Sequence, residues 1–149
     1  MPGYLVKPTN SVLVQGPHSI VEMKVGAAAT AAYMLPKRVV IYDGADGSVK
    51  EAGTNSEAAI GVLMEAPDQG IATAYAVADQ CRVVTKGIVL LCYASAATGC
   101  TPGDELKTVS PGKVTKSTTP STEAGMLIAK ALSTVTSGGP DADVIAELW

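Results

Sequence analysis

The sequence is poor in the residues that carry most enzyme chemistry. It has no phenylalanine, one histidine, three cysteines and one tryptophan among 149 residues. An odd number of cysteines without a Cys-x-x-Cys pair argues against a disulfide framework, and four dispersed Cys and His residues offer no local pair for a zinc site. We therefore predict no catalytic residue, no cofactor site and no metal site, and we predict that the protein is not an enzyme.

Low charge and the lack of long apolar runs exclude two further classes of partner. Charged residues make up 17% of the chain and the formal net charge is -3, which removes the attraction that nucleic-acid binders have for phosphate backbones. No segment approaches the roughly 20 apolar residues of a membrane-spanning helix. The N-terminus also lacks the basic-then-apolar order of a secretory signal. We expect no nucleic-acid partner, no membrane partner and no export.

What the chain does contain is short β-branched and aromatic runs between turn residues. These predict a mainly β fold: a single compact β-barrel-like or β-sandwich-like domain with at most one short helix. The strand candidates are residues 38–42, 71–77, 81–93 and a closing segment at 141–149. The Lys86-Gly87 step predicts a bend that divides the third of these. The alanine-rich segment 26–35, bounded by Gly26 and Pro36, predicts the helix.

One pattern of strands and turns occurs twice. The first copy has a strand at 38–42, a turn, Gly47-Ser48-Val49 and an apolar run at 59–66, and the second has a strand at 105–109, a turn, Gly112-Lys113-Val114 and an apolar run at 124–131. Gly47 and Gly112 are expected to supply the positive φ that such hairpin turns require. The pattern predicts two related hairpin units in one sheet or barrel. Chance likeness of two hairpins is the alternative, because Gly-x-Val is common at turns.

Two local motifs leave room for other chemistry. Lys24, within Glu22-Met23-Lys24-Val25, has the setting of the lysine that biotin carriers modify, but too few residues precede it for the carrier fold. Cys81 and Cys92 lie in apolar runs and are expected to be buried and inert, whereas Cys100 lies in a turn and is expected to be exposed. No spacing nominates a base or orienting residue beside these thiols.

The first residues predict an extended arm rather than part of a core. Residues 1–17 contain Pro2, Pro8 and Gly16-Pro17, and a terminal segment of this kind needs a partner to hold it. We predict an N-terminal arm at 1–17 followed by a β-barrel-like domain at 18–149. Trp149, at the end of an apolar strand, is a candidate interface anchor. The predicted interface residues are Tyr4, Leu5, Val6, Val12, Val14 and Trp149.

The sequence resembles the head-decoration, or capsid cement, proteins of tailed viruses and phages. The resemblance covers residues 36–149 and rests on the segments Thr85-Lys86-Gly87-Ile88-Val89, Pro102-Gly103-Asp104-Glu105-Leu106, Gly112-Lys113-Val114-Thr115 and Ala124-Gly125-Met126-Leu127-Ile128-Ala129-Lys130-Ala131. These segments are short and rich in glycine. The alanine-rich stretch at 27–32 and the cysteine pair of the central strand depart from the family pattern.

The resemblance implies a structural virion protein without an active site. Such proteins are made in the host cytoplasm, form homotrimers on the outer capsid surface, bind the major capsid protein and stabilise the shell. We expect the arm from Met1 to Gln15 to become ordered at seams between capsid subunits, so that its deletion abolishes shell binding but leaves a folded trimer. The alternative is a small β-barrel binding or carrier module without catalysis.

Overall fold

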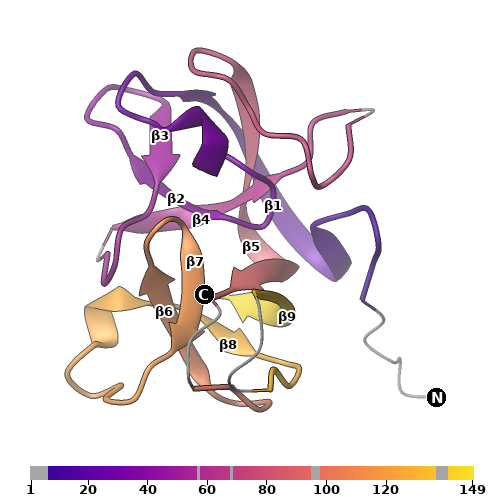
Figure 1. The fold of residues 1–149 in the computed structure, drawn as a ribbon, viewed down its shortest axis with the longest axis vertical. Helices are drawn as coiled ribbons and strands as arrows, with labels where there is room; N and C mark the ends of the chain where they lie inside the picture. Colours follow the sequence, from indigo (N-terminus) through magenta and orange to yellow (C-terminus); the bar gives the residue numbers. More distant parts are fainter. Residues whose placement is uncertain (1–6, 57, 68, 95–97, 137–140) are drawn as a thin grey trace.

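The described part of the chain folds into one nine-stranded sheet with almost no helix (Figure 1). The computed structural model describes residues 7–56, 58–67, 69–94, 98–136 and 141–149. The strands are β1 (Leu13–Val25), β2 (Val39–Tyr42), β3 (Ser48–Glu51), β4 (Ala59–Met64), β5 (Gln80–Tyr93), β6 (Glu105–Val109), β7 (Lys113–Lys116), β8 (Leu127–Ala131) and β9 (Ala142–Leu148). Two 3-10 turns, Ala31–Tyr33 and Ala124–Met126, are the helical elements of the described ranges, and no helix there is long and apolar enough to cross a membrane. The predicted mainly β, single-domain fold is confirmed.

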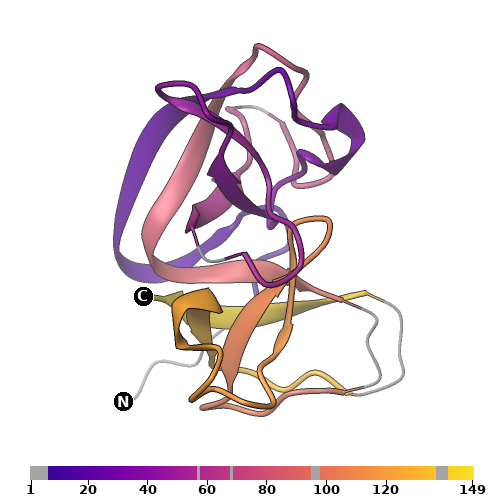
Figure 2. The same cartoon turned by 90° about the vertical axis from the view of Figure 1, so that its left-hand side faces the viewer.

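The sheet is not a simple barrel, because its hydrogen-bonded pairing closes twice. One circuit runs β1–β3–β2–β4–β5 and returns to β1. The other runs β5–β7–β6–β8–β9 and returns to β5. We call these circuit 1 and circuit 2. Figure 2 shows them as an upper and a lower lobe that meet along β5. Closing a sheet on itself satisfies strand edges that would otherwise be free to pair with other chains.

The two circuits repeat the same pairing, which confirms the internal repeat predicted from the sequence. β2 pairs antiparallel with β3 and β4, as β6 does with β7 and β8. A register shift between Val40 and Ile41 in the first set recurs between Leu106 and Lys107 in the second. The repeat is therefore structural and extends to the position of a β-bulge.

The entry to each unit has the same backbone conformation. Lys37 has φ 75° and Gly103 has φ 97°. The N–H of Lys37 donates to the Leu63 carbonyl at 3.0 Å, and the N–H of Gly103 donates to the Ala131 carbonyl at 2.8 Å. A lysine thus occupies a left-handed position that the second unit fills with glycine, the residue that has no steric penalty there.

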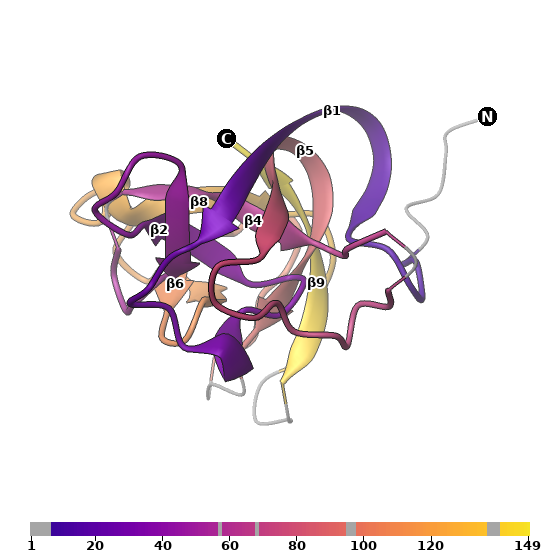
Figure 3. The ribbon, with the colours of Figure 1, turned by 90° about the horizontal axis from the view of Figure 1, so that it is seen from above.

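β5 serves both circuits because it is a long, strongly curved strand (Figure 3), and it contains Gly87. Residues before Gly87 pair with β1 and β4, and residues from Gly87 to Tyr93 pair with β9, while Ile88 and Val89 remain paired with β1 as well. Gly87 has φ 128°, and a Cβ atom there would lie 2.9 Å from His18 Cβ. The bend predicted at Lys86-Gly87 is present, but the strand is continuous and gains β9 as a further partner rather than ending.

Alternation along the strands sends side chains into two adjoining cores. The interior of circuit 1 contains Val25, Val40, Val49, Leu63 and Val83. Their strand neighbours Val39, Val62 and Val84 pack instead into the cluster that fills circuit 2. That second cluster crosses the boundary between the circuits, so the two lobes share a core and form one domain.

Two predicted elements are wrong. Segment 26–35 contains only the 3-10 turn at Ala31–Tyr33, and segment 71–77 contains no strand. Around the first segment, Asp43 accepts a hydrogen bond from the Ala28 N–H and Glu51 accepts one from the Thr30 N–H. These carboxylates, which follow or lie in neighbouring strands, hold the backbone of the segment on its irregular path.

The N-terminal segment contributes to the domain before residue 18. β1 begins at Leu13, and Val12 is fully buried. The N–H of Val12 donates to Glu65 Oε2 at 2.9 Å, and its carbonyl accepts from the Leu90 N–H at 2.8 Å. Residues 12–17 are thus attached to the sheet in this structure.

Candidate interface groove

A groove opens where β1, the bend of β5 and the end of β9 meet. It has a volume of about 530 Å³ and is lined by Gln15–Ser19, Lys86–Ile88 and Glu147–Trp149. Trp149 is 52% exposed there, next to the buried Leu148. Large aromatic side chains held half out of water beside an apolar groove are typical of protein–protein contact surfaces.

The local sequence explains why this groove forms. Gln15 pairs with Ile88 and Ser19 pairs with Lys86, so three residues of β1 lie opposite Gly87 alone. Gly16, with φ 79°, starts this bulge, and Pro17 follows it without an N–H to donate. The bulge stays close to β5, since a Cβ atom on Gly87 would lie 2.9 Å from His18 Cβ, and the two strands together form one wall of the groove.

The far wall of the groove is fixed by β9. Leu148 pairs with Gly87 and with Ala129, and the N–H of Trp149 donates to the Ile128 carbonyl at 3.1 Å. These contacts fix the backbone of the last residue while its indole remains half exposed. A preorganised anchor loses less conformational freedom on binding than a free one.

Few charges surround the groove, and none is arranged for acid–base chemistry. Lys86 and Glu147 are exposed at its rim. His18 Nδ1 lies 3.3 Å from the Gly16 carbonyl, within its own bulge. This arrangement can bury apolar surface and offer a few polar contacts, which suits binding of another protein.

The structure separates the predicted interface residues. Trp149 lies in the groove. Val14 is half-buried in β1, next to the groove residue Gln15. Val12 is 0% exposed, in the core of the chain itself, so it is not part of the interface proposed below. Tyr4, Leu5 and Val6 lie outside the described residues.

The groove residues of β1 and β5 were missed by reasoning from the sequence. The sequence predicts Gly16-Pro17 as part of the N-terminal arm, and Lys86-Gly87 as a bend that divides a strand. Both were visible as breaks in strand patterns. What one sequence does not show is that the two breaks face each other across the sheet.

All three thiols are buried. Cys81 is 1% exposed, Cys92 9% and Cys100 3%. Loss of solvation raises the pKa of the Cys81 thiol to about 11 and raises the pKa of Cys92 and Cys100 as well. The predicted exposure of Cys100 is wrong, because its N–H and carbonyl pair with Val135 and carry its side chain into the core. Neutral buried thiols are poor nucleophiles.

A lysine carrier site and a metal site find little support in the geometry. Lys24 lies inside β1, paired with Ser48 and Gln80, rather than at a hairpin turn where a carrier would display it. Among the residues that the structure describes, no group of three or more His, Cys, Asp or Glu side chains could hold a metal ion.

Comparison with known proteins finds likeness in structure but not in sequence. No protein-family model matches the chain, and no curated protein matches it. A chain from the capsid of Myoviridae phage XM1 superposes with a TM-score of 0.63 at 13% identity, covering 99% of this chain and 92% of that one. The N base of head fiber gp8.5 of bacteriophage phi29 superposes with a TM-score of 0.57 at 15% identity, covering 88% of this chain and 95% of that one.

These matches define the class of fold. Both solved structures are components of phage heads, and each is covered over nearly its whole length. The resemblance to phage head-decoration proteins, first seen in short glycine-rich segments, is thus confirmed for the fold of the chain. At this level of identity the likeness carries the fold, and function is argued separately.

Proposed function

We propose that the chain is a non-catalytic structural protein of a phage head, which binds the outer surface of the capsid shell and stabilises it. The observation that carries the proposal is the fold shared, over nearly the whole chain, with two phage-head components. The proposed partners are the major capsid protein and further copies of the chain itself, in a homotrimer.

The proposed contact with the shell is the groove that contains Trp149. Its half-exposed indole and apolar lining supply surface that is buried on binding, at about 25 cal/mol per Å². The formal net charge of -3 gives the chain no overall attraction to packaged DNA, which favours a protein partner.

Stabilisation by such a protein follows from mass action. A protein that binds the assembled shell but not free capsid subunits stabilises the shell by about 2.7 kcal/mol per site at a concentration 100 times its Kd. Symmetry repeats this contribution at every equivalent seam, and linked copies reinforce one another. A modest interface per copy is therefore sufficient.

Binding to shells gives a direct test. Undecorated shells assembled from the major capsid protein of the same phage would be mixed with the chain and sedimented. We expect the chain to co-sediment and to raise the temperature at which the shells come apart. Shells that neither bind the chain nor gain heat resistance would contradict the proposal.

Trp149→Ala locates the contact. We expect it to weaken shell binding about tenfold, as for an interface anchor. Tyr42→Ala is the matched control, because Tyr42 is an aromatic residue of similar exposure, 55%, outside the groove. Equal binding by both variants would remove the groove from the proposed interface.

The role of the N-terminal arm needs a shorter deletion than residues 1–15. Removal of Val12 and Leu13 would take a buried side chain and a paired residue from the sheet, so the loss of binding would not report on an arm. Deletion of residues 1–6 leaves every described contact in place. We expect this variant to keep its fold and to bind shells more weakly, and unchanged binding would refute the role of these residues.

A further inference from the structure

The internal repeat leaves one docking position filled and its counterpart open. The filled position is in circuit 1, which receives the β6–β7 turn of circuit 2 (Figure 1). The N–H of Val39 donates to the Gly112 carbonyl at 2.7 Å, and the N–H of Gly112 donates to the Ala52 carbonyl at 2.8 Å. Arg38 Nη1 adds a 2.6 Å hydrogen bond to the Pro111 carbonyl.

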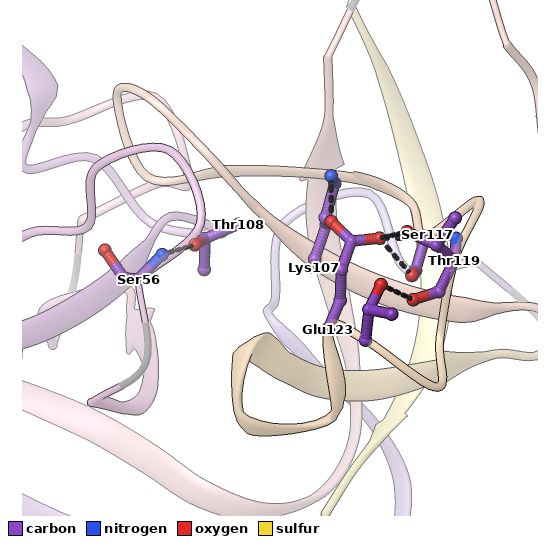
Figure 4. Close-up of polar contacts among 7 residues, drawn as sticks. Ser56, Lys107, Thr108, Ser117, Thr119 and Glu123 are labelled. Carbon is purple, nitrogen blue, oxygen red and sulfur yellow. Dashed lines mark hydrogen bonds and ion pairs between the residues drawn. The ribbon is translucent and has the colours of Figure 1, made fainter.

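The loop after β3 completes the docking position of circuit 1, the site that receives the β6–β7 turn. The N–H of Ser56 donates to Thr108 Oγ1 at 2.8 Å, a contact visible at the left of Figure 4. The N–H of Asn55 donates to the Thr108 carbonyl at 3.0 Å, and Thr54 Oγ1 accepts from the Ser110 N–H at 3.1 Å. Circuit 1 thus holds a glycine turn mainly through backbone groups and one hydroxyl-bearing loop.

Circuit 2 contains the equivalent docking position, and no residue of the described chain occupies it. The N–H of Ala52 donates to the Val39 carbonyl at 3.0 Å, and its repeat equivalent, the N–H of Ser117, donates to the Glu105 carbonyl at 2.8 Å. Beside Glu105 and Ser117 lies a groove of about 690 Å³, which Thr118 also lines. The position that circuit 1 fills with a turn is therefore hollow in circuit 2.

Glu123 fixes the shape of the circuit 2 groove. Its carboxylate accepts hydrogen bonds from Ser117 Oγ at 2.7 Å and Thr119 Oγ1 at 3.0 Å, and it pairs with the Lys107 ammonium (Figure 4). The residue is 8% exposed. The loop that lines the groove is thus fixed by a satisfied polar network, and a fixed loop loses little freedom when a partner docks.

The repeat also identifies a turn of the right shape. The turn that joins β2 and β3, Asp43 to Gly47, is the equivalent of the one that fills circuit 1. Gly47 and Gly112 both have φ 69°. A Cβ atom on Gly112 would lie 2.9 Å from the Val39 carbonyl oxygen, whereas one on Gly47 would meet nothing within 4 Å in the described chain. The turn of circuit 1 is exposed.

We propose that the β2–β3 turn of one copy of the chain docks into the circuit 2 groove of a second copy. The contact would repeat between molecules the docking that joins the two circuits within one. Asp104 replaces the repeat-equivalent Arg38, so the backbone of the turn would carry more of the recognition. Lys116, the one cation among the residues that line the groove, already pairs with Asp104 at 3.2 Å, so Asp46 of the turn would meet a neutralised pair rather than a free charge.

A donor turn and an acceptor groove on different lobes make a heterologous contact, which closes into a ring when the rotation permits. The inference deepens the self-association included in the proposed function and rests on that part of it alone. Binding to shells is a separate property and is measured separately.

Cross-linking between two singly substituted chains tests the contact. Ala45→Cys would be mixed with Thr118→Cys under mild oxidation, with the three native thiols protected by burial. We expect disulfide-linked dimers, because a disulfide needs Cα atoms about 5–6 Å apart, and docking of the turn in the groove would place the two substituted residues side by side. Ser121→Cys replaces Thr118→Cys in the matched control, since Ser121 is exposed on the same loop but does not line the groove. Equal cross-linking in both mixtures would overturn the inference.

Light scattering gives a second readout that does not depend on thiols. The unmodified chain is expected to form an oligomer, with a mass at least twice the 15.1 kDa of one chain. Thr118→Arg is expected to weaken the association at least tenfold, whereas Ser121→Arg leaves it unchanged. A monomeric unmodified chain, or an oligomer that Thr118→Arg does not weaken, would overturn the inference even if shells are bound. Oligomers that meet these expectations but do not bind shells would support it and contradict the proposed function instead.

Discussion

Glu123 shows at the scale of one residue how this chain uses its few charges. Its carboxylate is surrounded by the Lys107 ammonium and the hydroxyls of Ser117 and Thr119, which all favour the ionised form. The hydrogen bond from Lys107, followed by that from Ser117, holds the pKa of Glu123 at about 2. The unfolded chain has no such donors, so its Glu123 titrates near the ordinary value of about 4.3.

This difference predicts a loss of stability in acid. A carboxylate with a lowered pKa in the folded state contributes stability that is fully present above the unfolded pKa and is lost as the pH falls toward the folded pKa. We expect the urea midpoint of the chain to fall between about pH 5 and pH 2, and Glu123→Gln to be less stable at pH 7 and to show a shallower decline. Urea titrations at several pH values measure both, and parallel curves for the two proteins would contradict the assignment.

At the scale of elements, β5 is the strand on which the architecture depends. Its first half pairs with β1 in circuit 1, and its second half pairs with β9 in circuit 2. Pairing with β9 begins at Gly87, where φ is 128° and the backbone of the β1 bulge lies close. Gly87 is therefore constrained both by its own conformation and by its neighbour His18.

Gly87→Ala is predicted to destabilise the chain by about 1–3 kcal/mol, because alanine would be strained at this φ and its Cβ would press on His18. Gly125→Ala is the matched control, since a Cβ at Gly125 would meet nothing within 4 Å. Urea unfolding of both variants measures the difference. A Gly87→Ala chain as stable as the Gly125→Ala chain would show that the bend does not need glycine.

The elements also show how far the sequence determines the fold. The strands around Val39 and Leu106 could be predicted, because β-branched runs bounded by glycine turns carry a local signal. The failed helix at 26–35 was decided by tertiary contacts: a Cβ on Gly26 would lie 1.8 Å from Asp43 Oδ2, so the start of this segment packs directly on the β2–β3 turn. Tyr75, expected in a strand, instead donates its N–H to the Met34 carbonyl at 2.9 Å.

The candidate site was predictable only in part, for the same reason. Trp149 stood out as the single tryptophan at the end of an apolar strand. Its surroundings depend on the β1 bulge at Gly16 facing the β5 bend at Gly87, residues 71 positions apart in the chain. Contacts of this range are set by the fold as a whole, and a single sequence carries no local signal for them.

At the scale of the whole molecule, the question is whether the two circuits unfold together. They share β5, and Val39, Val62 and Val84 of circuit 1 pack into the core of circuit 2. The docked β6–β7 turn adds backbone hydrogen bonds across the same boundary. Unfolding of either circuit alone would expose this apolar surface, so we expect a single cooperative transition.

The three buried thiols report on that transition without any substitution. Cys81 lies in the circuit 1 core, Cys100 lies in the circuit 2 core, and Cys92 lies in the shared strand. Burial raises the pKa of each thiol, so none should react with an alkylating reagent at neutral pH in the folded chain. Labelling across a urea series, read by mass spectrometry of the separated peptides, is expected to give one midpoint for all three cysteines. A lower midpoint for Cys81 than for Cys100 would mean that circuit 1 opens while circuit 2 stays folded, and the shared core would then not couple them.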